Sequence, residues 1–202
     1  MYQLRRAINS DVESLVPLLL SSAPRALPRL FDEPPSYTAK DYLTYALSRL
    51  EGQFGYGNHW VIAQDGQAVA IACSWVSDPP QDFVSSTFDS LVSCYSGAQL
   101  SRVVQRCQAL GGVFPKPQGH ELCVGHVAVN ALHRRQGLAS ELLDHFQAMG
   151  RELDKTALTL DVEAGNHVAI DCYLKYGFVH TSSHNDDSEL ALGHYDHLRK
   201  AL

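Results

Sequence analysis

Short apolar runs alternate with amphipathic stretches along the whole chain. Runs with strand-like alternation or continuous apolar character predict strands at residues 2–7, 59–63, 68–72, 120–129 and 157–163. Helical spacing of apolar residues predicts helices at residues 12–19, 37–50, 136–153 and 166–176. A final antiparallel pair of strands is expected at 178–182 and 189–195, around a polar loop at 183–188. Strands and helices therefore alternate throughout, which is the pattern of a mixed α/β domain.

Glycine and proline residues mark the boundaries between these elements. The pair Asp65-Gly66 between the second and third predicted strands is a strong hairpin signal. Pro17 lies inside the first helical stripe, so we expect a kink or two short helices there. The proline-rich stretch at residues 24–35 is expected to form turns, with one helical turn at most.

Residues 78–119 are the least regular part of the chain. Prolines at both ends bound two amphipathic stretches, at 83–95 and 98–110, which predict a pair of helices. Two interpretations of this helical pair stay open. It could border a substrate pocket, or it could merely cover one face of the sheet.

Composition and charge narrow the class of protein. A chain of 202 residues fits a single domain spanning 1–202, and 45% apolar with 19% charged residues is typical of a globular protein. A formal net charge of −6 argues against a nucleic-acid partner, and no apolar run approaches the length of a membrane span. Five scattered cysteines without a C-x-x-C pair indicate reduced thiols, so we expect a cytoplasmic location.

The stretch from Val127 to Ala139 carries the first chemical signal. An apolar strand end leads through a short polar turn, Arg134-Arg135-Gln136-Gly137, into an amphipathic helix. The start of a helix has unpaired backbone N–H groups and the positive end of the helix dipole, and both favour an anion. A glycine lets a phosphate approach the backbone, and the arginines add charged donors. This pattern indicates a pyrophosphate site, although a tight turn with two solvated arginines would give the same letters.

A second motif follows at a suitable distance. Residues 166–178 read N-x-x-A-x-x-x-Y-x-x-Y-G-F and end a short helix at a glycine. Together, this motif and the R-R-Q-G-L-A run resemble the two signatures of the GNAT (GCN5-related N-acetyltransferase) superfamily, over about residues 121–179. Neither motif is specific alone, but their order and separation are. A Rossmann-type nucleotide site would need more glycines after an early strand and an acidic residue about twenty positions later, and neither is present.

The resemblance implies a fold, a donor and a reaction. The fold would be a mixed, mostly antiparallel sheet of six or seven strands with helices on both faces, its central strands splayed around the cofactor. The protein would then transfer an acetyl group from acetyl-CoA to an amine by direct attack. The alternative function is a non-catalytic module that binds or senses acyl-CoA. Residues implied in binding the coenzyme are Val127, Val129, Arg134, Arg135, Gln136, Gly137, Leu138, Ala139, Ser140 and Asn166.

The resemblance also suggests a general acid. Tyr173 occupies the position at which the family places the tyrosine that protonates the coenzyme A thiolate. A tyrosine that only packs in the core is the alternative, and Tyr176 is then the better core candidate because it precedes Gly177-Phe178. Asn166 would also cap its helix, and the cap alone explains its presence.

The general base stays open among several residues. Asp161 and Glu121 lie on the two strands that would flank the thioester, and either carboxylate could take a proton from an ammonium directly or through water. The family position for a strand glutamate lies nearer Cys123, which departs from the pattern. Strict alternation places His126 on the face opposite Glu121 and Cys123, but a bulge near Val127 would reverse that parity. We therefore expect Asp161 or Glu121, with His126 in reserve.

No metal is expected from the sequence. The histidines at 180, 184, 194 and 197 have loose spacing, and no carboxylate or cysteine set completes a zinc site near them. Cys123 lacks the accompanying base that an acyl-carrying nucleophile needs. The expected partner is an amine acceptor, either a small molecule or a protein N-terminus, and a homodimer is compatible with the sequence.

Overall fold

Seven strands form one sheet in the computed structural model, which describes residues 1–186 and 190–202. The strands are β1 (Tyr2–Arg6), β2 (His59–Gln64), β3 (Gln67–Trp75), β4 (Glu121–Val129), β5 (Ala157–Glu163), β6 (Val179–Asp186) and β7 (Gly193–Ala201). They lie in the order β1-β2-β3-β4-β5-β7-β6, and among the described pairs only β4 and β5 are parallel. The expected mixed, mostly antiparallel sheet is confirmed.

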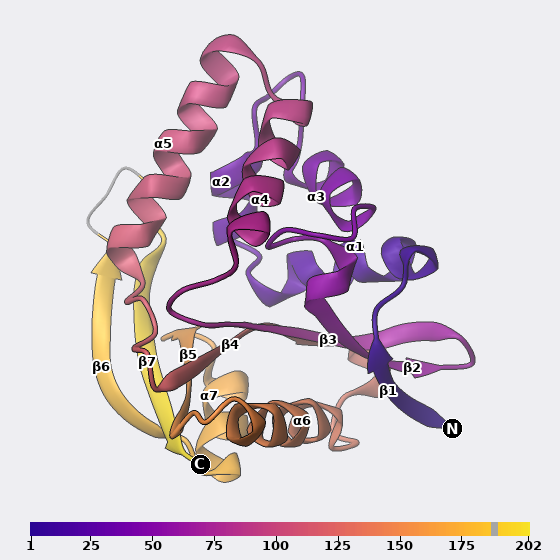
Figure 1. Ribbon diagram of the computed structural model, residues 1–202, viewed down its shortest axis with the longest axis vertical. Coiled ribbons are helices and arrows are strands. Elements are labelled where there is room, and N and C mark those ends of the chain that lie inside the picture. The colour runs from indigo at the N-terminus through magenta and orange to yellow at the C-terminus, as the bar shows by residue number, and fades with distance from the viewer. Residues whose placement is uncertain (187–189) are drawn as a thin grey trace.

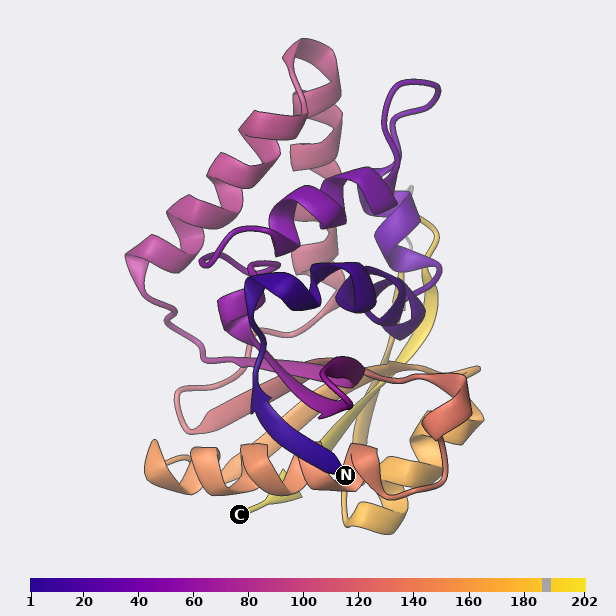
Figure 2. The ribbon, with the colours of Figure 1, turned by 90° about the vertical axis from the view of Figure 1, so that its right-hand side faces the viewer.

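Helices cover both faces of this sheet, as expected (Figures 1 and 2). One face carries α1 (Val12–Ser22), α2 (Ala26–Phe31), α3 (Ala39–Leu47), α4 (Gln81–Cys94) and α5 (Gly97–Val113). The other face carries α6 (Leu138–Glu152) and α7 (His167–Tyr176). In the part of the chain that the structure describes, no helix is long and apolar enough to cross a membrane.

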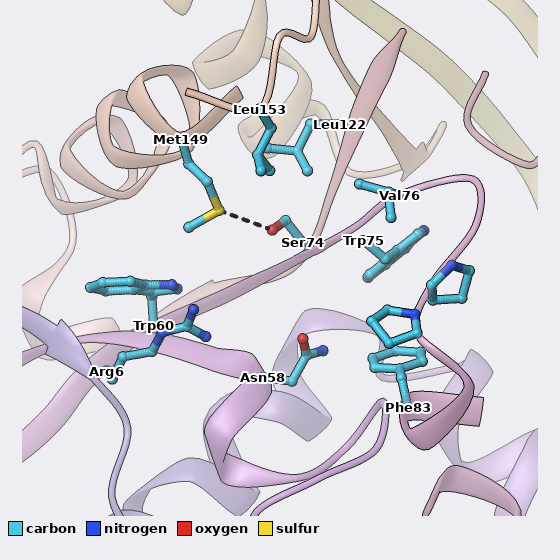
Figure 3. A pocket seen from close by; sticks show the side chains of 12 residues that line it. Arg6, Asn58, Trp60, Ser74, Trp75, Val76, Phe83, Leu122, Met149 and Leu153 are labelled. Atoms are coloured by element: carbon cyan, nitrogen blue, oxygen red, sulfur yellow. Dashed lines mark hydrogen bonds between the residues drawn. The ribbon is translucent and has the colours of Figure 1, made fainter. Parts of the chain in front are cut away.

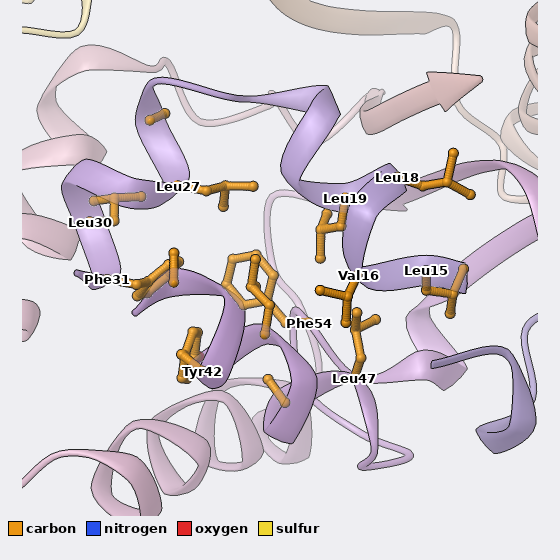
Figure 4. Packing of buried hydrophobic residues seen from close by; sticks show 14 of the residues in the cluster. Leu15, Val16, Leu18, Leu19, Leu27, Leu30, Phe31, Tyr42, Leu47 and Phe54 are labelled. Carbon is orange, nitrogen blue, oxygen red and sulfur yellow. The ribbon is translucent and has the colours of Figure 1, made fainter. Parts of the chain in front are cut away.

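Each face has its own hydrophobic core. On the α1–α5 face, buried leucines and aromatic rings from the first three helices pack around Phe54 (Figure 4). On the other face, Leu142 and Phe146 of α6 pack against apolar residues of the central strands, together with Phe178. The sheet is thus buried on both sides, which fixes β4 and β5 in the middle of the molecule.

Local turns follow the sequence pattern with two exceptions. The stretch at 24–35, expected to form turns with one helical turn, contains the six-residue helix α2. Asp65 and Gly66 both have positive φ, of 52° and 84°, and join β2 to β3 as the predicted hairpin. Of the two outcomes expected at Pro17, two short helices is wrong, because α1 runs from Val12 to Ser22 as one helix. Pro17 and Glu13, whose carbonyl loses its helical N–H partner, are both exposed. Water can therefore satisfy that carbonyl without breaking the helix.

The predicted helical pair at 78–119 forms α4 and α5, which extend away from the sheet (Figure 1). A buried carboxylate, Glu33, ties α5 to the segment after α2. Arg102 donates to it at 2.5 Å from Nη2, and Arg106 donates to its other oxygen. At the end of α5, the ring of Phe114 packs edge-on against Tyr195 of β7, with centroids 4.8 Å apart.

The C-terminal strands differ from expectation. The predicted strand at 178–182 extends to Asp186, so the predicted polar loop at 183–188 begins too early, and its residues 187 and 188 lie outside the described residues. The predicted strand at 189–195 is instead β7 at Gly193–Ala201. Residue 189 also lies outside the described part. The pattern misplaced β7 because polar side chains such as His197 and Arg199 interrupt its apolar run.

Candidate active site

The central parallel strands pair over only three residues. Glu121 to Cys123 of β4 pair with Ala157 to Thr159 of β5, although β4 continues to Val129 and β5 to Glu163. Beyond these three pairs, the backbones of β4 and β5 no longer pair with each other. Such an opening in the middle of a sheet exposes backbone donors and acceptors that an extended ligand can bind.

A β-bulge lies beside this opening. The register between β3 and β4 shifts by one residue between the pairs Cys73–Gly125 and Ile71–Ala128, and His126 has a φ of 53°. As a result, the His126 ring lies on the α1–α5 face, stacked 5.3 Å from the ring of Phe54. The alternation that placed His126 on the opposite face is therefore wrong. The bulge that would reverse that parity is present.

The phosphate-loop residues lie at the start of α6. Gly137 is the N-cap, with φ of 81°, and Arg135 also has positive φ, of 62°. Leu138, Ala139 and Ser140 form the first turn, where backbone N–H groups lack helical partners. The four residues from Arg134 to Gly137 precede the helix rather than forming its first turn, because the left-handed backbone at Gly137 cannot continue it.

Side chains around this loop are exposed and held by a few contacts. The hydroxyl of Tyr2 donates to Gln136 Oε1 at 2.7 Å, and Arg134 Nε donates to the Val129 carbonyl at 3.2 Å. A Cβ atom added to Gly137 would meet nothing within 4 Å. Glycine is therefore required here by its backbone conformation, and the space above it is open to a ligand.

Tyr173 lies on α7 and is the more buried of the two tyrosines, at 7% exposure. Burial raises the pKa of its hydroxyl, which favours the protonated form. Tyr176 is only partly buried, and its hydroxyl donates to Asp144 at 2.7 Å. The expectation that Tyr176 is the better core residue is therefore wrong. Asn166 caps α7, accepting from the Ala169 amide at 3.2 Å.

Asp161 has a partner that the sequence did not suggest. It lies directly opposite His197 of β7, and His197 Nδ1 donates to Asp161 Oδ1 at 2.8 Å. Both side chains are largely buried, with 15% of His197 and 12% of Asp161 exposed. The hydrogen bond to Asp161 raises the pKa of His197 above its ordinary value. In the described part of the chain, Nε2 of His197 makes no hydrogen bond and is not buried.

Glu121 is committed to other contacts. One oxygen accepts from the Gln118 amide at 2.8 Å, and the other lies 3.5 Å from Arg199 Nε and 3.8 Å from His120 Nε2. Glu121 also lies within the paired part of β4, before the opening begins. Of the two carboxylates, Asp161 is therefore the closer to the opening along the strands.

The reserve base, His126, is half-buried and belongs to a cluster whose other two members, His59 and Cys73, are buried. Its Nδ1 lies 3.1 Å from His59 Nε2 and 3.1 Å from Cys73 Sγ. Burial lowers the pKa of His126 to about 3 and that of His59 to about 4, so both rings are neutral near pH 7. His59 and Cys73 are cross-strand partners in the β2–β3 hairpin, but His126 lies 67 residues after His59 in the sequence, so no spacing motif could have identified the cluster.

A cavity of about 340 Å³ lies elsewhere, between the start of α4 and the end of α6 (Figure 3). Trp60, Trp75, Phe83 and Met149 contribute to its lining. None of the predicted coenzyme or catalytic residues lines it. We therefore place the candidate active site at the β4–β5 opening rather than at this cavity.

Comparison with known proteins addresses the chain as a whole. The model of the acetyltransferase (GNAT) family matches residues 25–178. An N-acetyltransferase from Staphylococcus aureus Mu50 has a TM-score of 0.68 at 15% identity, covering 98% of this chain and 99% of that one. A structure described as an acetyltransferase gives 0.64 at 20% identity and 98% coverage of both chains. A ribosomal-protein-alanine N-acetyltransferase from Brucella melitensis gives 0.58 at 16% identity and 99% coverage of both. No curated protein matches the sequence.

Proposed function

Because the chain belongs to the GNAT acetyltransferase family, we propose that it transfers an acetyl group from acetyl-CoA to an amine by direct attack. The observation that carries this proposal is that the opening between β4 and β5 is followed by the open N-terminus of α6. The unpaired ends of β4 and β5 lead toward the N-terminus of α6, where Gly137 leaves open space. An extended thiol arm and a pyrophosphate need these two features in this order.

The donor would lie along β4 and reach α6. The backbone of Val127 and Val129 would bind the acyl carbonyl and the arm of the coenzyme. The amides of Leu138, Ala139 and Ser140 would bind the pyrophosphate, with Arg134 and Arg135 close enough in sequence to add charge. Gln136 is held by Tyr2, so it would border the site in a fixed orientation.

Asp161 and His197 would act together as the general base. With Nδ1–H bound to Asp161, the lone pair of His197 is on Nε2, which can take a proton from the acceptor nitrogen. The neutral amine then bonds to the acetyl carbon, and the nitrogen loses its second proton to solvent as the amide forms. The carboxylate of Asp161 would stabilise the imidazolium that forms, which is the same role that a carboxylate has beside a histidine base in other enzymes.

Tyr173 would supply the proton for the leaving group. Breaking the carbon–sulfur bond leaves a thiolate, and the raised pKa of Tyr173 keeps its hydroxyl protonated until that moment. Tyr173 packs in the same hydrophobic core as Leu160 and Val162, which lie on β5 beyond its last pair with β4. Asn166 would support this site by fixing the start of α7.

The acceptor would be a cationic amine. Asp161, Glu121 and Glu163 point carboxylates toward the α1–α5 side of the sheet, and two of them are balanced by the arginines Arg199 and Arg25. Asp161 faces a histidine instead, so it would attract an ammonium. The five cysteines are all free thiols, which supports the cytoplasmic location that we propose.

The test is a thiol-release assay with acetyl-CoA against a panel of amines that includes small polyamines, amino acids and peptides with free N-termini. Acceptor-dependent release is the expected result. Calorimetric binding of acetyl-CoA without release by any amine class would favour the non-catalytic binding module. Absence of both binding and release would contradict the proposal.

A further inference from the structure

Three potential metal-ligand atoms converge under the β4 bulge. They are Nε2 of His59, Sγ of Cys73 and Nδ1 of His126, and all lie within 4.8 Å of one another. His126 Nδ1 is 3.1 Å from each of the other two. The residues come from β2, β3 and β4, so the sheet itself holds them together.

The orientation of His59 leaves its inner nitrogen able to bind a metal. Its Nδ1 lies 2.9 Å from the carbonyl oxygen of Gly55, an acceptor only, so Nδ1 carries the hydrogen. In the neutral ring Nε2 then has a lone pair directed at the other two residues. A backbone carbonyl that binds the outer N–H is the usual second contact of a metal-binding histidine.

We propose that His59, Cys73 and His126 form a binding site for a divalent transition-metal ion of borderline softness, such as Zn²⁺. Tetrahedral zinc places two nitrogens about 3.3 Å apart and a nitrogen and sulfur about 3.6 Å apart. The distance from His126 Nδ1 would lengthen by about 0.2 Å to His59 Nε2 and by about 0.5 Å to Cys73 Sγ to reach these values. The distance between His59 Nε2 and Cys73 Sγ is at most 4.8 Å. It must therefore shorten by no more than about 1.2 Å to reach the nitrogen–sulfur distance of a zinc site.

Binding of the metal ion would release one proton from the protein. The Cys73 thiol releases its proton to solvent as its sulfur binds the ion, and the His126 hydrogen moves from Nδ1 to Nε2. His126 is partly exposed, as are its neighbours Gly125 and Val127, so this ring lies on the route by which an ion and a fourth ligand would reach the site. The site would bind the ion whether or not the protein transfers an acetyl group.

A second arrangement of the same atoms is a hydrogen-bonded chain with no ion. In it, the Nδ1–H of His126 donates to His59 Nε2, and the Cys73 thiol donates to the Gly125 carbonyl 3.5 Å away. This chain forms at the observed distances, whereas binding of an ion needs the shifts given above. The two differ in whether Cys73 can become a metal thiolate.

Titration of the metal-stripped full chain with Co²⁺ tests the proposal. A thiolate ligand gives a sulfur-to-cobalt charge-transfer band, which the surface histidines cannot produce. We expect this band to saturate at one equivalent in the wild type and in Cys123→Ser, a buried cysteine on β4 outside the cluster. Cys73→Ser should abolish the band, and Zn²⁺ should remove it by competition.

His126→Asn provides a second variant, because asparagine tolerates positive φ and so disturbs the bulge least. It should weaken Co²⁺ binding at least tenfold while the far-ultraviolet circular dichroism is retained. A wild type without the charge-transfer band would overturn the proposal in favour of the hydrogen-bonded chain. So would a band that persists in Cys73→Ser, or an unchanged affinity in folded His126→Asn.

Discussion

His197 and Asp161 are direct cross-strand partners on β7 and β5, and their side chains meet at 2.8 Å on the face that carries α1–α5. Cross-strand neighbours of opposite charge stabilise a sheet, so this pair has a structural role whatever else it does. Its position matters more for function. Asp161 comes two residues after Thr159, the last β5 residue that pairs with β4, so the hydrogen-bonded pair lies where the central opening begins.

The first prediction separates the two members of this pair by pH dependence. His197 acts as a base only when it is neutral, so kcat/KM should rise with pH through its raised pKa. Asp161→Asn removes the cause of that raised pKa, so the rising limb should move to lower pH while the maximum rate falls. His197→Gln should abolish the limb and reduce the rate about a hundredfold or more.

The profiles must be measured with one acceptor, because the acceptor's own pKa contributes equally to every variant. His126→Asn serves as the control and should keep the wild-type limb. Glu121→Gln should move the limb slightly to lower pH without abolishing it, because the charge of Glu121 also raises the pKa of His197. If Asp161→Asn abolishes the limb and His197→Gln keeps it, the carboxylate alone is the base. Loss of the limb only in His126→Asn would contradict both assignments.

The second prediction concerns the two tyrosines of α7. Tyr173→Phe should leave acetyl-CoA affinity nearly unchanged and slow turnover about a hundredfold or more, since it removes only the proton donor. Tyr176→Phe is the matched control, because it also loses one hydroxyl but that hydroxyl binds Asp144. It should cost about 1 kcal/mol of stability and little activity. Equal turnover in both variants would assign Tyr173 to packing.

The sequence pattern predicted those elements well whose structure depends on neighbouring residues. The strand at 157–163 coincides with β5, and the Asp65-Gly66 hairpin appears with the expected positive φ values. The position of β7 was predicted wrongly because the strand carries many polar side chains. Alternation of apolar and polar residues identifies a strand only where one of its faces is apolar. Boundaries therefore failed at the C-terminal end of the sheet.

The candidate site was predictable only in part for a related reason. The residues of the loop around Gly137 are contiguous in sequence, so they form a motif that can be recognised from the sequence alone. The partner of Asp161 is 36 residues away, and the cluster of His59, Cys73 and His126 spans 67 residues. Such contacts depend on strand order and on a one-residue bulge, neither of which a single sequence determines.

The third prediction tests the coenzyme loop. Gly137→Val places a branched side chain where φ is 81° and where the proposed pyrophosphate site is open. It should weaken acetyl-CoA binding at least tenfold in calorimetry, and it should also destabilise the protein because a side chain is strained at positive φ. The effect of backbone strain on stability must therefore be measured separately from the effect of the valine side chain on acetyl-CoA binding.

Gly66→Val is the matched control for that strain. Gly66 has φ of 84°, and an added Cβ there also meets nothing within 4 Å, but it lies in the β2–β3 hairpin. Both variants should lower the thermal midpoint, and only Gly137→Val should lose affinity. Equal affinities in the two folded variants would remove the coenzyme from this loop.

The last prediction concerns stability and acid sensitivity at Glu33. Hydrogen bonds from Arg102 hold the pKa of this carboxyl below its ordinary value, with Arg106 contributing as well. A group whose folded pKa is depressed adds stability above its unfolded pKa, and that stability is lost as pH falls through the folded value. Glu33→Gln should therefore cost about 1 kcal/mol near pH 7, or roughly 2–4 °C in thermal midpoint, because Arg102 is half exposed and partly screened.

The difference from the wild type should shrink as the pH falls below about 4.5, the ordinary pKa of a glutamate, since the unfolded carboxyl is then protonated first and the folded one follows at lower pH. Glu13→Gln, at an exposed carboxylate of α1, is the control and should change the midpoint little at any pH. Urea or thermal unfolding from pH 3 to 8 measures both. Because Glu33 joins α5 to the segment after α2, proteolysis of Glu33→Gln should also begin within α5. A constant gap between Glu33→Gln and wild type down to pH 3 would show that shape, rather than charge, stabilises this junction.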